Sequence, residues 1–253
     1  MLKTVYLTVL LGIAGVAGAT AAEGAPIRIS GSTSVANAIV LPHQAGIART
    51  AGVEIVVTAK SSGDGVKDLA CGRADIAMIS ADLDEIMGRM SQVMAAYNVT
   101  KNDLKTFDVG EARVEFIVNK DSPVTRLSAD QIKGIYLGTL TNWRQLGAPA
   151  AVIQPVAPGP GDAMRIMLEA ELLGGQKIPS TAELGDEAPQ IAGIVARIPN
   201  GIGFVSSATP DFMRKGTRTV DTEDHLVQHL TLVTRGEPSG DIAKVIDAIV
   251  HLH

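Results

Sequence analysis

The feature that most constrains the fold of this 253-residue chain is an alternation of strand-like and helix-like segments joined by serine and glycine turns. Residues 27–30 form a short strand pattern, and the turn at 31–34 (Gly-Ser-Thr-Ser) leads into a helical pattern. Residues 53–60, rich in β-branched side chains, lead in the same way through 61–65 (Ser-Ser-Gly-Asp-Gly) into a second helix. This repeated unit predicts an α/β fold whose loops at the strand ends face a ligand.

The same patterns continue along the rest of the chain, with residues 174–187 as a loop. We expect helices at 35–50, 66–72, 128–137, 162–173, 191–196 and 242–252, and strands at 75–80, 115–119, 152–156, 201–205 and 230–234. Both halves of the chain are therefore predicted to be mixed α/β.

The first 21 residues have the composition of a secretory signal peptide. Lys3 precedes an apolar run at 5–16, and small residues follow up to Ala21. An uncleaved anchor is the alternative, but the apolar run is shorter than a spanning helix requires. We expect a cleaved leader and a protein that works in the periplasm.

Composition argues against several classes of partner and chemistry. The formal net charge is −5 and Lys and Arg are scattered, which argues against nucleic acid as a partner. Aromatic residues make up 3% of the chain, too few for stacking surfaces. Cys71 is the only cysteine, so it has no internal disulfide partner and is expected to be a small buried side chain, unless exposure lets it link a dimer. We expect a monomer.

The sequence offers no catalytic or metal-binding pattern. It has no Gly-x-Ser-x-Gly elbow, no Walker loop and no paired zinc spacing. His225 and His229 would share one face of a helix, but no third ligand is near, which favours surface positions. Asp82, Asp84 and Glu85 fit a loop and helix start better than a pair of general acids. We predict no enzyme, no metal and no cofactor.

The two serine-rich turns suit the binding of an anion. The first N–H groups of a helix lack intrahelical partners and carry partial positive charge. Nearby hydroxyl groups add donors without Lys or Arg, although each turn taken singly fits an ordinary helix cap better. The candidate ligand residues of these turns are Ser32, Thr33, Ser34, Ser61, Ser62 and Gly63.

Longer stretches of the sequence resemble the periplasmic phosphate-binding proteins of ABC uptake systems, particularly their shorter relatives. The most specific stretch is 127–147, which includes Gly-Ile-Tyr-Leu-Gly and Thr-Asn-Trp, and 72–78 and 200–204 add to it. The likeness covers nearly the whole chain after the leader. It implies the type II periplasmic binding protein fold, a two-lobed Venus flytrap with two mixed α/β lobes joined by a two-stranded hinge.

The resemblance also implies a division of the chain. Lobe one would comprise residues 22–112 and 206–253, and lobe two residues 113–205. Crossings near 111–114 and 205–208 would form the hinge. A ligand that contacts both lobes would close them by favouring the closed state.

Carried over position by position, the family's phosphate contacts are kept in lobe one. Thr33 and Ser34 fall on the first contact turn, and Ser62 falls on the second. Ser80 stands where longer members use an aspartate and where shorter relatives often have a serine followed by an arginine. Ala81 follows here, so that arginine is missing.

Lobe two departs further from the family pattern, which has an arginine and then Ser-Gly-Thr at a helix start. In a gap-free alignment, Pro158 takes the place of the arginine, and Asp162, Ala163 and Met164 replace Ser-Gly-Thr. Asp162 suits a helix start but repels an anion. Loss of one charge-assisted bond costs on the order of 2 to 3 kcal/mol. Gly161 and Asp162 remain candidate ligand residues.

Two functions are open at this point. The first is a solute-binding component of an ABC uptake system, with a permease as partner and with phosphate, another oxyanion, a phosphonate-like molecule or a neutral or cationic solute as ligand. The second is a non-transport periplasmic partner or signalling protein that reuses the flytrap fold. Arg165 is either a replacement for the missing guanidinium or a surface residue. An open pocket faced by Asp162 favours a solute that donates hydrogen bonds, whereas apolar groups that fill it favour an interaction module.

Overall fold

The computed structural model describes residues 24–160, 162–185, 188–223 and 226–252. The predicted signal peptide, Gly161 and His225 lie outside these ranges. Within them, no helix is both long and apolar enough to cross a membrane.

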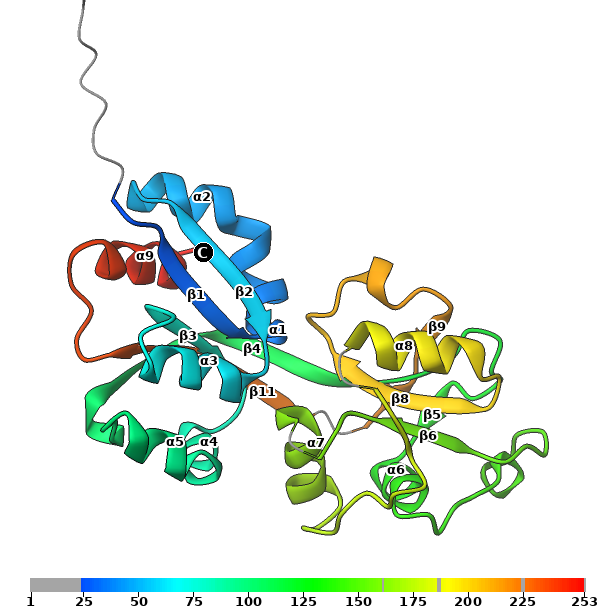
Figure 1. Ribbon diagram of the computed structural model, residues 1–253. Coiled ribbons are helices and arrows are strands. Elements are labelled where there is room, and N and C mark those ends of the chain that lie inside the picture. Colours follow the sequence, from blue (N-terminus) through cyan, green and yellow to red (C-terminus); the bar gives the residue numbers. More distant parts are fainter. Residues whose placement is uncertain (1–23, 161, 186–187, 224–225, 253) are drawn as a thin grey trace, which may run out of the picture.

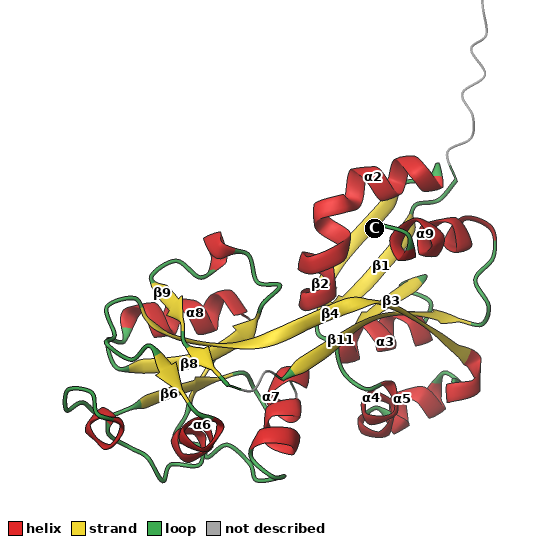
Figure 2. Cartoon of the chain, turned by 180° about the vertical axis from the view of Figure 1, so that it is seen from behind, coloured by secondary structure: helices red, strands yellow, loops and turns green. Residues whose placement is uncertain are grey.

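The first lobe is a sheet with helices on both faces (Figures 1 and 2). Its strand β1 pairs in parallel with β2 and β3, and β11 runs antiparallel to β3. The strands are β1 (Ile27–Ser32), β2 (Ile55–Lys60), β3 (Ile76–Ile79) and β11 (Val227–Arg235). The helices are α1 (Thr33–Val35), α2 (Leu41–Ala51), α3 (Ser62–Ala70), α4 (Leu83–Arg89), α5 (Ser91–Ala96) and α9 (Gly240–Val250), with a π-helical stretch, Ala36–Val40, between α1 and α2.

Most strands of the second lobe are short, and this lobe holds the aromatic core of the molecule. Phe116, Tyr136 and Phe204 contact one another there, and Trp143 is buried in the same cluster. The strands are β5 (Arg126–Leu127), β6 (Gln154–Ala157), β7 (Glu183–Leu184), β8 (Gly201–Ser206), β9 (Thr217–Thr219) and β10 (Asp221–Thr222). The helices are α6 (Ala129–Tyr136), α7 (Ala163–Met167) and α8 (Ala188–Arg197), and a π-helical stretch, Leu168–Leu172, follows α7.

One long strand, β4 (Leu104–Asn119), passes through both lobes. Its first part pairs with β11 and its last part pairs with β8, both antiparallel. The hydrogen-bonded order is β2-β1-β3-β11-β4-β8-β6-β7, with β9 on the free edge of β4. The predicted two-lobed, mixed α/β fold is confirmed.

The second crossing between the lobes differs from the predicted position at 205–208. Strand β9 pairs with β4, β10 pairs with β5, and Val220 packs in the second core. Strand β11 pairs with one edge of β4 in the first lobe only, which leaves the same edge unpaired in the second lobe. Strand β9 pairs with that edge there, so the chain stays in the second lobe beyond 208. We propose that lobe two extends from 114 to 226 and that the chain returns at the start of β11.

Some element predictions also need correction. Helix α3 starts at Ser62 and not at 66, because the Ser61 hydroxyl caps it by accepting the Asp64 N–H at 3.1 Å. His229 lies on strand β11 and not on a helix. Helices α4 and α5 were not predicted, although Asp82 does begin a helix by capping α4.

Candidate functional site

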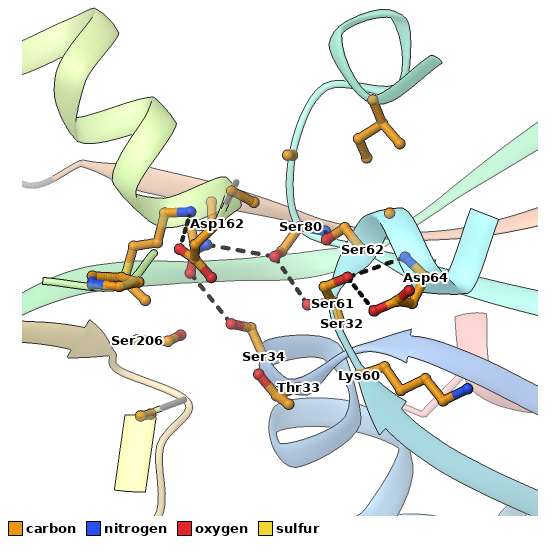
Figure 3. A pocket seen from close by; sticks show the side chains of 18 of the residues that line it. Ser32, Thr33, Ser34, Lys60, Ser61, Ser62, Asp64, Ser80, Asp162 and Ser206 are labelled. Atoms are coloured by element: carbon orange, nitrogen blue, oxygen red, sulfur yellow. Dashed lines mark hydrogen bonds between the residues drawn. The ribbon is translucent and has the colours of Figure 1, made fainter. Parts of the chain in front are cut away.

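A cavity of about 520 Å³ lies between the lobes, and Figure 3 shows it from close by. The first lobe contributes the two serine turns, and the second lobe contributes the starts of α7 and α8. Every predicted ligand residue that the structure describes lines this cavity, namely Ser32, Thr33, Ser34, Ser61, Ser62, Gly63, Ser80 and Asp162. Gly161 lies outside the described residues, and the ligand role of the others stays a prediction.

The serine turns converge because β1, β2 and β3 are parallel, so their carboxyl ends lie at the same edge of the sheet. Two glycines allow the close approach. Gly31 has φ +130°, and a Cβ there would lie 2.2 Å from the Met78 carbonyl oxygen. A Cβ on Gly65 would lie 2.6 Å from the Ser30 carbonyl oxygen. Only glycine lets the first turn of α3 pack directly on β1.

Four buried serines, Ser32, Ser34, Ser62 and Ser80, form what we call the serine cluster. Ser80 lies at its centre. The Ser32 hydroxyl donates to Ser80 Oγ at 2.9 Å, and the Ser80 N–H donates to Ser62 Oγ at 3.1 Å. Since Ser62 Oγ and Ser80 Oγ act as acceptors in these bonds, each keeps its own hydroxyl proton for a ligand.

Gln228 completes the cluster, although no sequence pattern predicted it. It lies on β11, is 2% exposed, and joins two serines. Ser34 Oγ donates to Gln228 Oε1 at 3.4 Å, and Gln228 Nε2 donates to Ser80 Oγ at 3.5 Å. The antiparallel pairing of β11 with β3 brings this residue to the serine turns from a distant part of the chain. Gln228 therefore links strand β11 to the serine cluster.

Ser61 differs from the other predicted residues because its hydroxyl is engaged within its own helix cap. Ser61 Oγ donates to Asp64 Oδ2 at 2.8 Å and accepts the Asp64 N–H. Both side chains are exposed at the rim of the cavity. The capping function that the sequence suggested for this turn is thus real at Ser61, whereas Ser62 turns its hydroxyl towards the cluster.

The two cations that line the cavity have partners of their own. Lys60 Nζ lies 2.9 Å from Asp68 Oδ2, and in Figure 3 its side chain runs away from the serine cluster. Arg89 pairs with Glu85. Although burial opposes it, hydrogen bonds from Lys60, Ser30 and Arg73 lower the pKa of Asp68 to about 2, so this carboxylate stays charged and holds Lys60. Neither cation replaces the guanidinium that the family resemblance leads one to expect.

The wall from lobe two carries one charged side chain, Asp162, the hydroxyl side chains of Ser206 and Thr209, and apolar groups. The Asp162 carboxylate caps α7, and Oδ1 accepts the N–H groups of Met164 at 2.8 Å and Arg165 at 3.1 Å. Burial raises the pKa of this carboxyl, against the lowering effect of the two capping bonds. The side chains of Pro158, Ala163, Met164, Ala188 and Ile191 line the wall around it.

The Arg165 side chain is buried, so the prediction of a surface residue is wrong. Its side chain is 6% exposed, and it is absent from the cavity lining. Nε donates to Glu169 Oε1 at 2.9 Å, Nη1 to the Pro158 carbonyl at 3.0 Å, and Nη2 to the Ile178 carbonyl at 2.9 Å. The guanidinium therefore links separate segments of lobe two to one another.

Comparisons with known proteins agree with this architecture. A family model described as a PBP superfamily domain matches residues 16–246. The phosphate-binding protein PstS of Bacillus subtilis (strain 168) is 24% identical over 234 residues, which cover 87% of this chain and 74% of PstS.

Two solved structures cover most of the chain. A Clostridium perfringens protein, assigned as a phosphate ABC transporter substrate-binding protein and solved with bound phosphate, superposes with a TM-score of 0.74 at 25% identity, covering 89% of this chain and 93% of its own. An ABC-type phosphate transport receptor from Vibrio cholerae gives a TM-score of 0.63 at 24% identity, covering 88% and 93%. The predicted resemblance is confirmed.

Proposed function

The chain belongs to the family described as a PBP superfamily domain, and on this basis we propose that it is a periplasmic solute-binding protein of the phosphate-binding type. In this proposal the cavity between the lobes takes one small solute, and an ABC permease receives it. Two things support the proposal: the relatives named as phosphate-binding and transport proteins, and a cavity lined by residues of both lobes.

The proposed ligand accepts hydrogen bonds from the serine cluster and is not a tightly held phosphate dianion. The observation that carries this is the wall of lobe two, where Asp162 and apolar side chains stand in place of the family's arginine and Ser-Gly-Thr. A carboxylate repels a second negative charge. Arg165, a cation close to Asp162 in the sequence, is bonded inside lobe two. Loss of one charge-assisted bond, on the order of 2 to 3 kcal/mol, weakens phosphate binding by about 30- to 140-fold.

A ligand panel tests this function. Thermal-shift titrations would use phosphate, sulfate, phosphonates, amino acids and polyamines, since a ligand at about 100 times its Kd adds about 2.7 kcal/mol of stability. We expect a rise in Tm with at least one solute. The Ser62→Ala variant should lose that rise, and Ser91→Ala, at an exposed serine outside the cavity, should keep it. Silence across the whole panel would contradict the proposal and favour a partner protein without a solute.

A further inference from the structure

Asp162 has one carboxylate oxygen that its helix cap does not use. Both capping bonds go to Oδ1, and among the described residues no hydrogen bond or ion pair engages Oδ2. Among the described residues, every fully buried side-chain oxygen or nitrogen has a hydrogen-bond partner. Because Oδ2 has none, it is not fully buried. Because Asp162 lines the cavity, Oδ2 is available to a ligand there.

The two sides of the cavity therefore differ in chemistry. The first lobe offers hydroxyl protons of Ser62 and Ser80, which suit an acceptor such as an oxyanion. The second lobe offers the Asp162 carboxylate with apolar side chains, Met164 and Ile191 among them, and the hydroxyl groups of Ser206 and Thr209 also line this side. A solute that satisfies both sides has an acceptor at one end, a donor at the other and an apolar part between them.

We propose that the cavity selects a zwitterion, with an oxyanion group at the serine cluster, a short alkyl linker along the lobe-two wall and an ammonium group at Asp162 Oδ2. This inference rests on the proposed solute-binding function and narrows it to one class of ligand. Aminoalkylphosphonates belong to that class, because they place a tetrahedral oxyanion and an ammonium group on one short chain.

An ammonium group fits Asp162 better than a neutral hydroxyl for a reason of charge. A carboxylate in a closed cleft is unfavourable unless a cation compensates it. Burial raises the pKa of Asp162, so its charged form is disfavoured in this position despite the two capping bonds. The nearby cation, Arg165, gives its side-chain bonds to Glu169 and to two backbone carbonyls. The charge of a bound ammonium would complete the site.

Two phosphonates that differ only in the ammonium group test the inference. Isothermal titration of the protein at neutral pH would compare aminoethylphosphonate with ethylphosphonate. We expect aminoethylphosphonate to bind about tenfold tighter or more, the gain typical of one charge-assisted bond. The Asp162→Asn variant keeps a side chain that caps helices equally well, so the lobe should fold while the preference disappears. In the matched control, Asp130→Asn, an exposed carboxylate at the start of α6 changes and the preference should remain.

The outcomes separate this inference from the function on which it rests. Equal affinities for the two phosphonates, or a preference that survives in Asp162→Asn, would overturn the zwitterion while leaving a solute-binding protein. Binding of neither phosphonate, together with binding of a panel solute that is not a zwitterion, such as sulfate or a polyamine, would also overturn it. If no solute of the panel binds, both proposals are wrong.

Discussion

Replacing Arg165 by methionine should destabilise lobe two without acting through the ligand. The guanidinium makes three side-chain bonds, to the Glu169 carboxylate and to the carbonyls of Pro158 and Ile178. Although burial opposes it, bonds from Lys177 and Arg165 lower the pKa of Glu169, so this carboxylate, 3% exposed, is charged at neutral pH.

The expected loss can be worked out from these contacts. Removing one partner of a buried ion pair typically costs about 3 to 5 kcal/mol, because the other charge stays buried. Lys177 Nζ remains 2.8 Å from Glu169 Oε2, which places Arg165→Met at the lower end, about 3 kcal/mol. Replacing both residues of the pair, as in Arg165→Met with Glu169→Met, should recover part of that loss, since no buried charge is then left without a partner; the Lys177 side chain is 76% exposed and stays hydrated.

Urea unfolding followed by tryptophan fluorescence measures this effect in lobe two. Trp143 is the only tryptophan of the chain and lies in the core of lobe two. With a typical urea slope, a loss of about 3 kcal/mol lowers the midpoint by about 1 to 3 M. Arg197→Met, at an exposed arginine at the end of α8, is the control and should change stability by less than about 1 kcal/mol. An unchanged midpoint for Arg165→Met, combined with weaker solute binding, would refute the structural role.

Three further predictions follow from other contacts. Asp68→Asn should cost about 2 kcal/mol at neutral pH, because a folded pKa below the unfolded value stabilises at neutral pH; the difference should vanish in unfolding curves as the pH falls to about 2. Gln228→Leu should leave the fold intact but weaken solute binding about tenfold in titrations, since Ser80 loses a partner; unchanged affinity would separate Gln228 from the site. Gly65→Ala should destabilise by about 1 to 3 kcal/mol in thermal melts, whereas Gly88→Ala, with open space around it, should be neutral or stabilising.

Local signals predicted the serine side of the site. Ser32 ends a parallel strand, Ser34 and Ser62 follow parallel strands, and such strand ends meet at one edge of a sheet whatever the rest of the fold does. Asp162 was predicted as a helix cap facing the cavity, and the structure places it so. The spacing of strands and turns predicted the serine positions, whereas the place of Asp162 came from the resemblance to the phosphate-binding family.

Other features depend on contacts that no local pattern encodes. Gln228 reaches the site only because β11 pairs with β3, a contact between distant parts of the chain. Arg165 and Glu169 have an i,i+4 spacing that looks the same on an exposed helix and on a buried one, so burial was not predictable. The proposed return crossing differs from the predicted one because the short strand β9, which pairs with an edge of β4 in lobe two, carries little sequence signal.

The most direct test of the account is a calorimetric titration of the protein with phosphate, alongside the variant with Pro158→Arg, Asp162→Ser, Ala163→Gly and Met164→Thr. We predict no saturable binding of phosphate by the protein at micromolar concentrations, and a gain of about 30-fold or more in the variant, which removes the Asp162 carboxylate and restores the family's donors. Saturable micromolar binding of phosphate by the unmodified protein would contradict the claim that the wall of lobe two has changed its ligand.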